Sequence, residues 1–138
     1  MIIDATNLIL GRIASFAAKN ALLGKDIQII NCENAVVTGN KKTTLKHYTE
    51  RLARGSRTRG PFTLKRPDMF VKRTIRGMLD KRTENGKRAL KKIRCYISVP
   101  SNLQDKKSEK MQGMDISKLE IVKYIKVNEI CKQLGGRI

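Results

Sequence analysis

Several residue types that build catalytic, metal or disulfide centres are scarce in this chain of 138 residues. It has one histidine, His47, and three cysteines, Cys32, Cys95 and Cys131, which lie far apart in sequence. Three dispersed cysteines provide neither a disulfide framework nor a zinc ribbon, which needs four ligands in close pairs. We therefore expect the cysteines to be small core residues in a reducing compartment. A lone histidine supplies no histidine pair or cluster, and we expect no metal site and no cofactor.

Aromatic residues and long apolar runs are also lacking. Aromatic side chains make up 4% of the chain, and no strand pattern carries the paired aromatics of an RNA-recognition motif or an OB-fold. No apolar run reaches the roughly eighteen residues of a membrane-spanning helix, and no helical pattern joins a wholly basic face to one rich in Trp or Phe. Met1–Ala5 lacks the basic start and long apolar stretch of a signal peptide. These features predict a cytoplasmic protein without a membrane partner.

Acidic residues are outnumbered, since 12 Asp and Glu stand against 30 Lys and Arg, a formal net charge of +18. The excess is concentrated in residues 41–95, which hold 19 of the bases and four of the acids. Such an excess strains a compact fold by self-repulsion, and a polyanion normally neutralises it. If the basic residues only formed a solvated surface, their excess would not be confined to one segment of the chain. We therefore predict a nucleic-acid partner for this basic middle.

Hydrophobic patterning predicts one α/β domain over residues 1–138. Residues 1–4 and 26–31 have the pattern of buried strands, and apolar residues recur at helical spacing from Leu10 to Leu22 between them. Strand, helix and strand within about thirty residues indicate a βαβ unit with parallel strands. A helix is expected after Asn40, with Leu45, Tyr48 and Leu52 as its apolar stripe. Further helices are expected over 68–79, after Thr83 and near the C-terminus, with strands at 94–99 and 123–127. Residues 53–67 are predicted to form a loop, and 101–114 a polar, mobile connection.

The predicted helix over 68–79 has two opposite faces. Val71, Ile75, Met78 and Leu79 share an apolar arc, and the cations between them fall on the other side. Arginine outnumbers lysine from residue 51 to residue 76, and the guanidinium group suits phosphate recognition. No helix-turn-helix, zinc finger or leucine zipper is evident, so a large irregular RNA is favoured over DNA. The predicted RNA-binding residues are Lys41, Lys42, Lys46, Arg51, Arg54, Arg57, Arg59, Arg66, Lys72, Arg73, Arg76, Lys81, Arg82, Lys87 and Arg88.

The strongest catalytic signal is the segment Gly39–Thr43, which resembles a phosphate-binding loop. The full signature needs a glycine where Asn34 stands, and Asn40 separates the second glycine from lysine. An anion is still favoured at this helix start, and an RNA phosphate would serve. Acids such as Asp4, Asp26 and Glu33 are scattered, and we predict turn and capping roles for them rather than catalysis. The chain is predicted not to be an enzyme, with no catalytic residue. The alternative is a nucleotide-binding or nucleic-acid-processing enzyme on an α/β fold.

Two motifs in the basic middle, Arg59–Phe62 and Arg73–Leu79, resemble the L13 family of large-subunit ribosomal proteins in its archaeal and eukaryotic form. Ile3–Thr6 with Leu10–Ser15, and Val36–Asn40, match further family motifs in the same order. Several ordered motifs are more specific than one. The sequence departs from the family at residue 80, where aspartate stands in place of the common proline, and it lacks the His-Pro-His stretch of bacterial members.

The resemblance implies a single three-layer α/β/α domain around a four-stranded, mostly parallel sheet, with a basic RNA-binding loop. It also implies large-subunit ribosomal RNA and neighbouring ribosomal proteins as partners, and no small-molecule substrate. An RNA-binding regulator that acts away from the ribosome remains open. The resemblance is loosest after residue 100.

Overall fold

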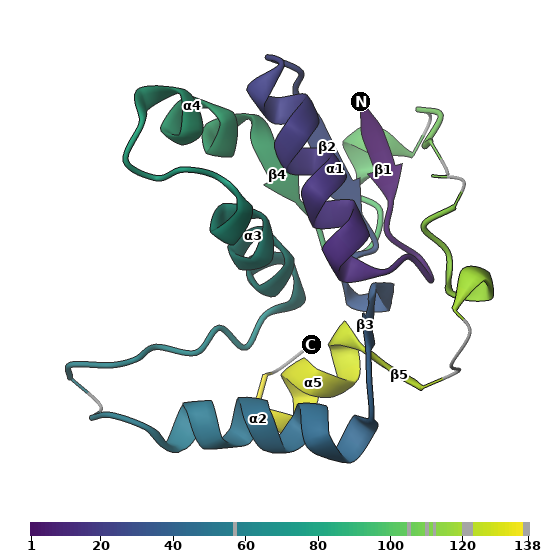
Figure 1. Cartoon of the computed structure of the whole chain (residues 1–138). Coiled ribbons are helices and arrows are strands. Elements are labelled where there is room, and N and C mark those ends of the chain that lie inside the picture. Colours follow the sequence, from purple (N-terminus) through teal and green to yellow (C-terminus); the bar gives the residue numbers. More distant parts are fainter. Residues whose placement is uncertain (57, 105, 110, 112, 120–122, 137–138) are drawn as a thin grey trace.

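The computed structural model describes all residues except 57, 105, 110, 112, 120–122 and 137–138 (Figure 1). Arg57 and part of the 101–114 connection therefore lie outside the described residues. The helices and strands follow in the order β1 (Ile2–Asp4), α1 (Leu10–Leu22), β2 (Ile27–Ile30), η1 (Cys32–Asn34), β3 (Val36–Thr38), α2 (Lys41–Ala53), α3 (Pro67–Met78), α4 (Glu84–Lys92), β4 (Ile93–Cys95), η2 (Ser101–Leu103), η3 (Ile116–Lys118), β5 (Tyr124–Lys126) and α5 (Val127–Gln133).

The predicted βαβ unit is confirmed. Strands β1 and β2 are parallel, with Ile3 opposite Ile29, and β4 joins β2 in parallel with Ile93 opposite Ile27. Helix α1 connects β1 to β2 and turns a face rich in buried alanine toward the core. Small side chains on that face let the helix lie close to its neighbours, because no bulky group holds the backbones apart.

The sheet is smaller than predicted. Among the described residues the parallel sheet has three strands in the order β1-β2-β4, and not four. Strands β3 and β5 form a separate antiparallel pair, in which Val37 lies opposite Ile125. The chain leaves the parallel sheet after β2 because Asn31 adopts a left-handed conformation with φ of 55° and the turn η1 follows directly. β3 instead runs beside residues 8–9, where Val36 forms an isolated parallel bridge with Ile9 and its amide donates to the Leu8 carbonyl.

The helices that cover the parallel sheet gather on one face. Ile3, Ile29 and Ile93 on this face are fully buried in one core with residues of α1, α3 and α4. On the other face, Ile30 is buried, Gln28 is half-buried and Arg94 is exposed. The predicted three-layer arrangement, with helices on both faces, is therefore not confirmed in the part of the chain that the structure describes.

The 101–114 connection contributes more than a polar link. Leu103 in η2 is buried, and Met111 and Met114 pack against the core. The Glu109 amide donates a hydrogen bond of 2.8 Å to the Ile2 carbonyl, so the connection runs beside the outer edge of β1. This contact covers strand groups that would otherwise be free to pair with another chain.

Helix α2 is attached to the rest of the domain by few contacts. None of its residues is fully buried; Leu45 and Tyr48 are half-buried and the third member of the predicted stripe, Leu52, is exposed. The helix lies against α5, and the Tyr48 ring meets the Phe70 ring of α3 at 5.3 Å between centroids. A long loop links α2 to α3 (Figure 1).

Candidate nucleic-acid interface

Helix α2 presents the first group of predicted cations. Asn40 begins the helix, and its side-chain oxygen accepts a hydrogen bond of 3.1 Å from the Lys42 amide, which satisfies one free donor of the first turn. Lys41 forms an ion pair with Glu129 of α5. Arg51, in the last turn, has no acidic partner among the described ion pairs and is exposed. The charge available to a ligand therefore increases toward the C-terminal end of α2.

The loop between α2 and α3 contains a tight turn from Ser56 to Gly60. The two residues exchange backbone hydrogen bonds of 3.2 and 3.0 Å. Gly55 approaches this turn so closely that an added Cβ would lie 1.9 Å from the Gly60 carbonyl oxygen. Arg54 and Arg59 are exposed on either side of the turn. The described part of the loop is basic, as predicted, and includes this hydrogen-bonded turn.

Helix α3 separates core and surface along its length. Val71 and Ile75 are fully buried, whereas Arg73 and Arg76 are exposed. The prediction that Met78 faces the core is wrong, since 43% of it is exposed. Met78 is the last residue of α3, and the chain then leaves the helical path so that Leu79 is buried in its place.

A cationic cleft of about 350 Å³ lies between α2 and α3. Four cations from three segments line it: Arg51 from α2, Arg73 and Arg76 from α3, and Lys81 from the following loop. The other described lining residues are Tyr48, Phe70, Thr74 and Gly77, and no acidic side chain is among the described residues that line the cleft. Burial raises the pKa of Tyr48, so its hydroxyl stays neutral and adds no negative charge. We call this site the α2–α3 cleft.

A second cavity, of about 360 Å³, opens beside the first and is largely apolar. We call it the Phe62 pocket. It is lined by Phe62, Leu64, Met69, Lys72, Arg73, Arg76 and Leu90. Arg73 and Arg76 line both cavities, and the lining of the Phe62 pocket contains no acid within the described part of the chain.

Comparison with known proteins identifies the family of the chain that carries these cavities. The model of the family "Ribosomal protein L13" matches residues 1–102. The chain belongs to the ribosomal protein L13 family. Membership in a family of ribosomal structural proteins also confirms the prediction that the chain is not an enzyme.

Three curated relatives of this family member come from archaea. The protein "Large ribosomal subunit protein uL13" of Methanosarcina barkeri is 42% identical over 137 residues, which cover 99% of this chain and 98% of the relative. The protein of the same name from Methanococcoides burtonii is 38% identical, with coverage of 99% and 98%. The one from Halobacterium salinarum is 34% identical, with coverage of 100% and 92%. The resemblance thus extends beyond residue 102 into the C-terminal part.

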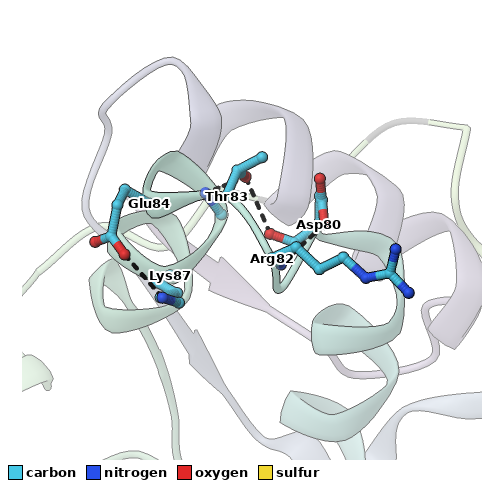
Figure 2. Close-up of polar contacts among 6 residues, drawn as sticks. Asp80, Arg82, Thr83, Glu84 and Lys87 are labelled. Atoms are coloured by element: carbon cyan, nitrogen blue, oxygen red, sulfur yellow. Dashed lines mark hydrogen bonds and ion pairs between the residues drawn. The ribbon is translucent and has the colours of Figure 1, made fainter.

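Asp80 organises the turn before α4 (Figure 2). Its carboxylate accepts a hydrogen bond of 2.9 Å from the Arg82 amide, and its carbonyl accepts one of 3.2 Å from the Thr83 hydroxyl. The Thr83 hydroxyl in turn accepts from the Gly86 amide at 3.2 Å and begins α4. Hydrogen bonds therefore hold a turn in which a proline ring would restrict the backbone directly.

Nearly all predicted RNA-binding residues reach the surface. Lys72 is half-buried, and Arg57 is not among the described residues. Lys46 and Lys87 lie 3.9 and 2.8 Å from Glu50 and Glu84. Exposed side chains occur at the other predicted positions, namely Lys41, Lys42, Lys46, Arg51, Arg54, Arg59, Arg66, Arg73, Arg76, Lys81, Arg82, Lys87 and Arg88.

The structure brings only some of these cations together. Arg51, Arg73, Arg76 and Lys81 meet in the α2–α3 cleft, whereas Lys41 and Lys42 stand at the opposite end of α2. Arg82, Lys87 and Arg88 belong to α4 and the turn before it. The predicted set is thus a series of separate cationic groups around one dense cluster.

A third basic cavity, of about 590 Å³, involves residues that the sequence did not single out. Arg12, Lys118 and Lys123 line it together with the Thr38–Asn40 turn. These cations come from three distant segments, and no local spacing in the sequence relates them. Phe62 also had no predicted role of its own, although it belongs to the Arg59–Phe62 motif.

Acids and cysteines have structural roles in the described residues. The Asp4 carboxylate accepts hydrogen bonds from Thr6 and Asn31, and Glu33 accepts from the Ser98 amide. These contacts confirm the predicted turn roles of Asp4 and Glu33. No group of three His, Cys, Asp or Glu in the described part of the chain could hold a metal ion, and no described helix is long and apolar enough to cross a membrane.

The cysteines are free thiols within the domain, as predicted. Cys32 and Cys131 are buried and Cys95 is half-buried. Burial, with a smaller contribution from the negative charge of Asp68, raises the pKa of Cys131 to about 11. A hydrogen bond with the Cys95 side chain, together with burial, raises the pKa of Cys32. Both thiols are therefore neutral at physiological pH and poor nucleophiles.

Proposed function

We propose that the chain is a structural constituent of the large ribosomal subunit that binds and organises large-subunit ribosomal RNA through the Lys/Arg-rich surface of residues 41–95, and so supports translation in the cytoplasm. The α2–α3 cleft is the observation that carries the proposal. Arg51, Arg73, Arg76 and Lys81 meet there, and the residues that the structure describes in the lining include no acid. Like charges gathered at one place are destabilising alone and favourable when a polyanion lies between them.

The mechanism is the neutralisation of several phosphates at fixed relative positions. A guanidinium group donates two parallel hydrogen bonds to a phosphate, which fixes direction as well as distance. The cations of the cleft come from α2, α3 and the loop after α3, so phosphates bound to them would hold these elements at a set separation. Each neutralised phosphate also releases counterions, which makes the binding strongly dependent on salt.

Membership of the L13 family supports the ribosome as the place of action, and the three relatives described above are named as proteins of the large ribosomal subunit. Neighbouring proteins of that subunit are the expected protein partners. The half-exposed face of the parallel sheet and the surfaces outside residues 41–95 are available to them.

Fractionation of a cell lysate on a sucrose gradient tests the proposal. The chain should sediment with large subunits at low salt and leave them as salt is raised. Crosslinking within the purified particle should join residues 41–95 to ribosomal RNA. Recovery of the chain mainly at the top of the gradient, or crosslinks chiefly to messenger RNA, would contradict the proposed role.

A further inference from the structure

We propose that the Phe62 pocket receives an unpaired base of the bound RNA, while the phosphate next to that base lies in the α2–α3 cleft. This inference rests on the proposed function and specifies the form of RNA that the site recognises. It follows from the exposure of Phe62, from how Phe62 is held, and from the order of the two cavities.

Phe62 is 63% exposed, although it is one of three phenylalanines in the chain and stands in its most basic segment. Met69 is 45% exposed on the same pocket wall, where Leu64 and Leu90 complete an apolar lining. Apolar surface of this kind is unfavourable in water, and it gains stability when a flat apolar group covers it. A nucleobase is such a group, and every base has a face that can stack on an aromatic ring.

The Phe62 backbone and ring are both in contact with neighbouring groups. Nη1 of Arg73 donates a hydrogen bond of 2.7 Å to the Phe62 carbonyl, which ties the loop to α3. A Cβ built on Gly60 would lie 3.1 Å from the Phe62 ring, so the ring lies next to Gly60 while 63% of Phe62 stays exposed. A ring positioned in this way loses little freedom when a base stacks on it.

The order of the two cavities matches the order of groups in a nucleotide. Arg73 and Arg76 line both, so they form the wall that the apolar pocket shares with the cationic cleft. In RNA a planar base is joined through ribose to a phosphate, and each of these groups finds its complement in one of the cavities. An apolar side chain of a protein partner would fill the pocket but would leave the cations Lys72, Arg73 and Arg76 around it unmatched.

Selectivity for RNA form follows from this arrangement. A base stacked within a duplex cannot enter the pocket, whereas a base in a bulge, loop or single strand can. The chain should therefore bind an RNA hairpin with one unpaired base more tightly than the same hairpin fully paired.

Fluorescence titration with the full chain measures this selectivity. The probes are two hairpins of equal sequence, one with a single unpaired 2-aminopurine and one in which that base is paired. We expect the fluorescence of the unpaired probe to be quenched on binding, because the base stacks on Phe62. Phe62→Ala should weaken binding of the unpaired probe by about tenfold and leave the paired probe unchanged.

Two further variants control the experiment. Phe62→Tyr keeps the ring and should restore selective binding. Leu23→Ala removes another exposed apolar side chain, 69% exposed at the end of α1, and should change neither affinity. Thermal unfolding of each variant establishes that it is folded.

The outcomes separate the inference from the proposed function. If the wild type binds neither hairpin, the proposed function fails. If it binds both and Phe62→Ala changes neither affinity, or both equally, the base pocket is overturned while RNA binding stands. A third outcome is that the Phe62→Ala variant binds RNA as the wild type does but no longer assembles into large subunits. This outcome would assign the pocket to a protein neighbour and would also overturn the inference.

Discussion

Ile75 and Met78, less than one turn apart on α3, have opposite environments and therefore opposite tolerance to charge. Ile75 is fully buried, whereas 43% of Met78 is exposed. Ile75→Asp places an unpaired carboxylate in the core and should lower the free energy of unfolding by about 3–5 kcal/mol. Met78→Asp should lower it by less than about 1 kcal/mol. Urea unfolding followed by circular dichroism measures both, and equal losses would contradict the environments assigned to the two side chains.

Gly86 and Gly77 form a second matched pair at the residue scale. A Cβ on Gly86 would lie 1.8 Å from the Asp80 carbonyl oxygen, whereas a Cβ on Gly77 would meet nothing within 4 Å. Gly86→Ala must displace the Asp80–Thr83 turn and should cost about 2–4 kcal/mol of unfolding free energy. Gly77→Ala should be neutral or stabilise by up to about 1 kcal/mol, because alanine favours the helix.

Thermal denaturation of the two glycine variants provides the measurement. A drop in melting temperature for Gly86→Ala alone supports the close packing of α4 against the turn that precedes it. Similar melting temperatures for both variants would mean that the turn can move away at little cost.

At the scale of elements, the loop between α2 and α3 is the segment most sensitive to RNA. Arg54, Arg59 and Lys65 are exposed trypsin sites, and the loop has no helix or strand among its described residues. We expect cleavage there in the free protein and protection when RNA covers the cations. Limited digestion followed by mass spectrometry identifies the sites. Lys25, in the turn after α1, serves as the internal control and should be cut equally in both states.

Equal protection of the loop with and without RNA would indicate that the Ser56–Gly60 turn is already as ordered as the helices. In that case RNA would bind a preformed surface and would not order the loop.

The helices also differ in how far their sequence patterns predicted their environment. The helical spacing of apolar residues from Leu10 to Leu22 predicted one apolar face on α1, and the structure buries that face. The stripe in α2 correctly predicted a helix but overstated its burial, since Leu52 is exposed. Periodicity indicates which residues share a face, but only the neighbours decide how deeply that face is covered. Helix α2 packs against α5 and meets α3 through the contact between the Tyr48 and Phe70 rings. Both of these contact areas are small.

At the scale of the whole molecule, salt dependence reports how many phosphates are neutralised. If about six to ten cations engage, the affinity should fall by about three to five decades between 50 and 200 mM salt, by analogy with duplex DNA. Replacing Arg73 and Arg76 together by alanine should reduce the slope by about two contacts and leave the protein folded. Filter binding at several salt concentrations measures the slope.

A variant with the same loss of charge at another place is the control. Lys19→Ala with Lys25→Ala also removes two exposed cations, but from the end of α1 and the following turn, outside the α2–α3 cleft. Its slope should stay close to that of the wild type. If both pairs of substitutions flatten the slope equally, RNA responds to net charge alone and not to the cleft.

The sequence by itself determined the local features of this protein: the βαβ unit, the opposite faces of α3, the basic middle and its likeness to the L13 family. These depend on spacings of two to four residues and on composition, which a sequence states directly. The tertiary structure alone decided that the sheet divides after Asn31, that Met78 lies outside, and that Arg51 meets Arg73 and Arg76. It also placed Phe62 beside those arginines. These contacts join residues that are ten to twenty-five positions apart in the sequence. They depend on how α2, the loop and α3 pack together, and no local sequence pattern encodes that packing.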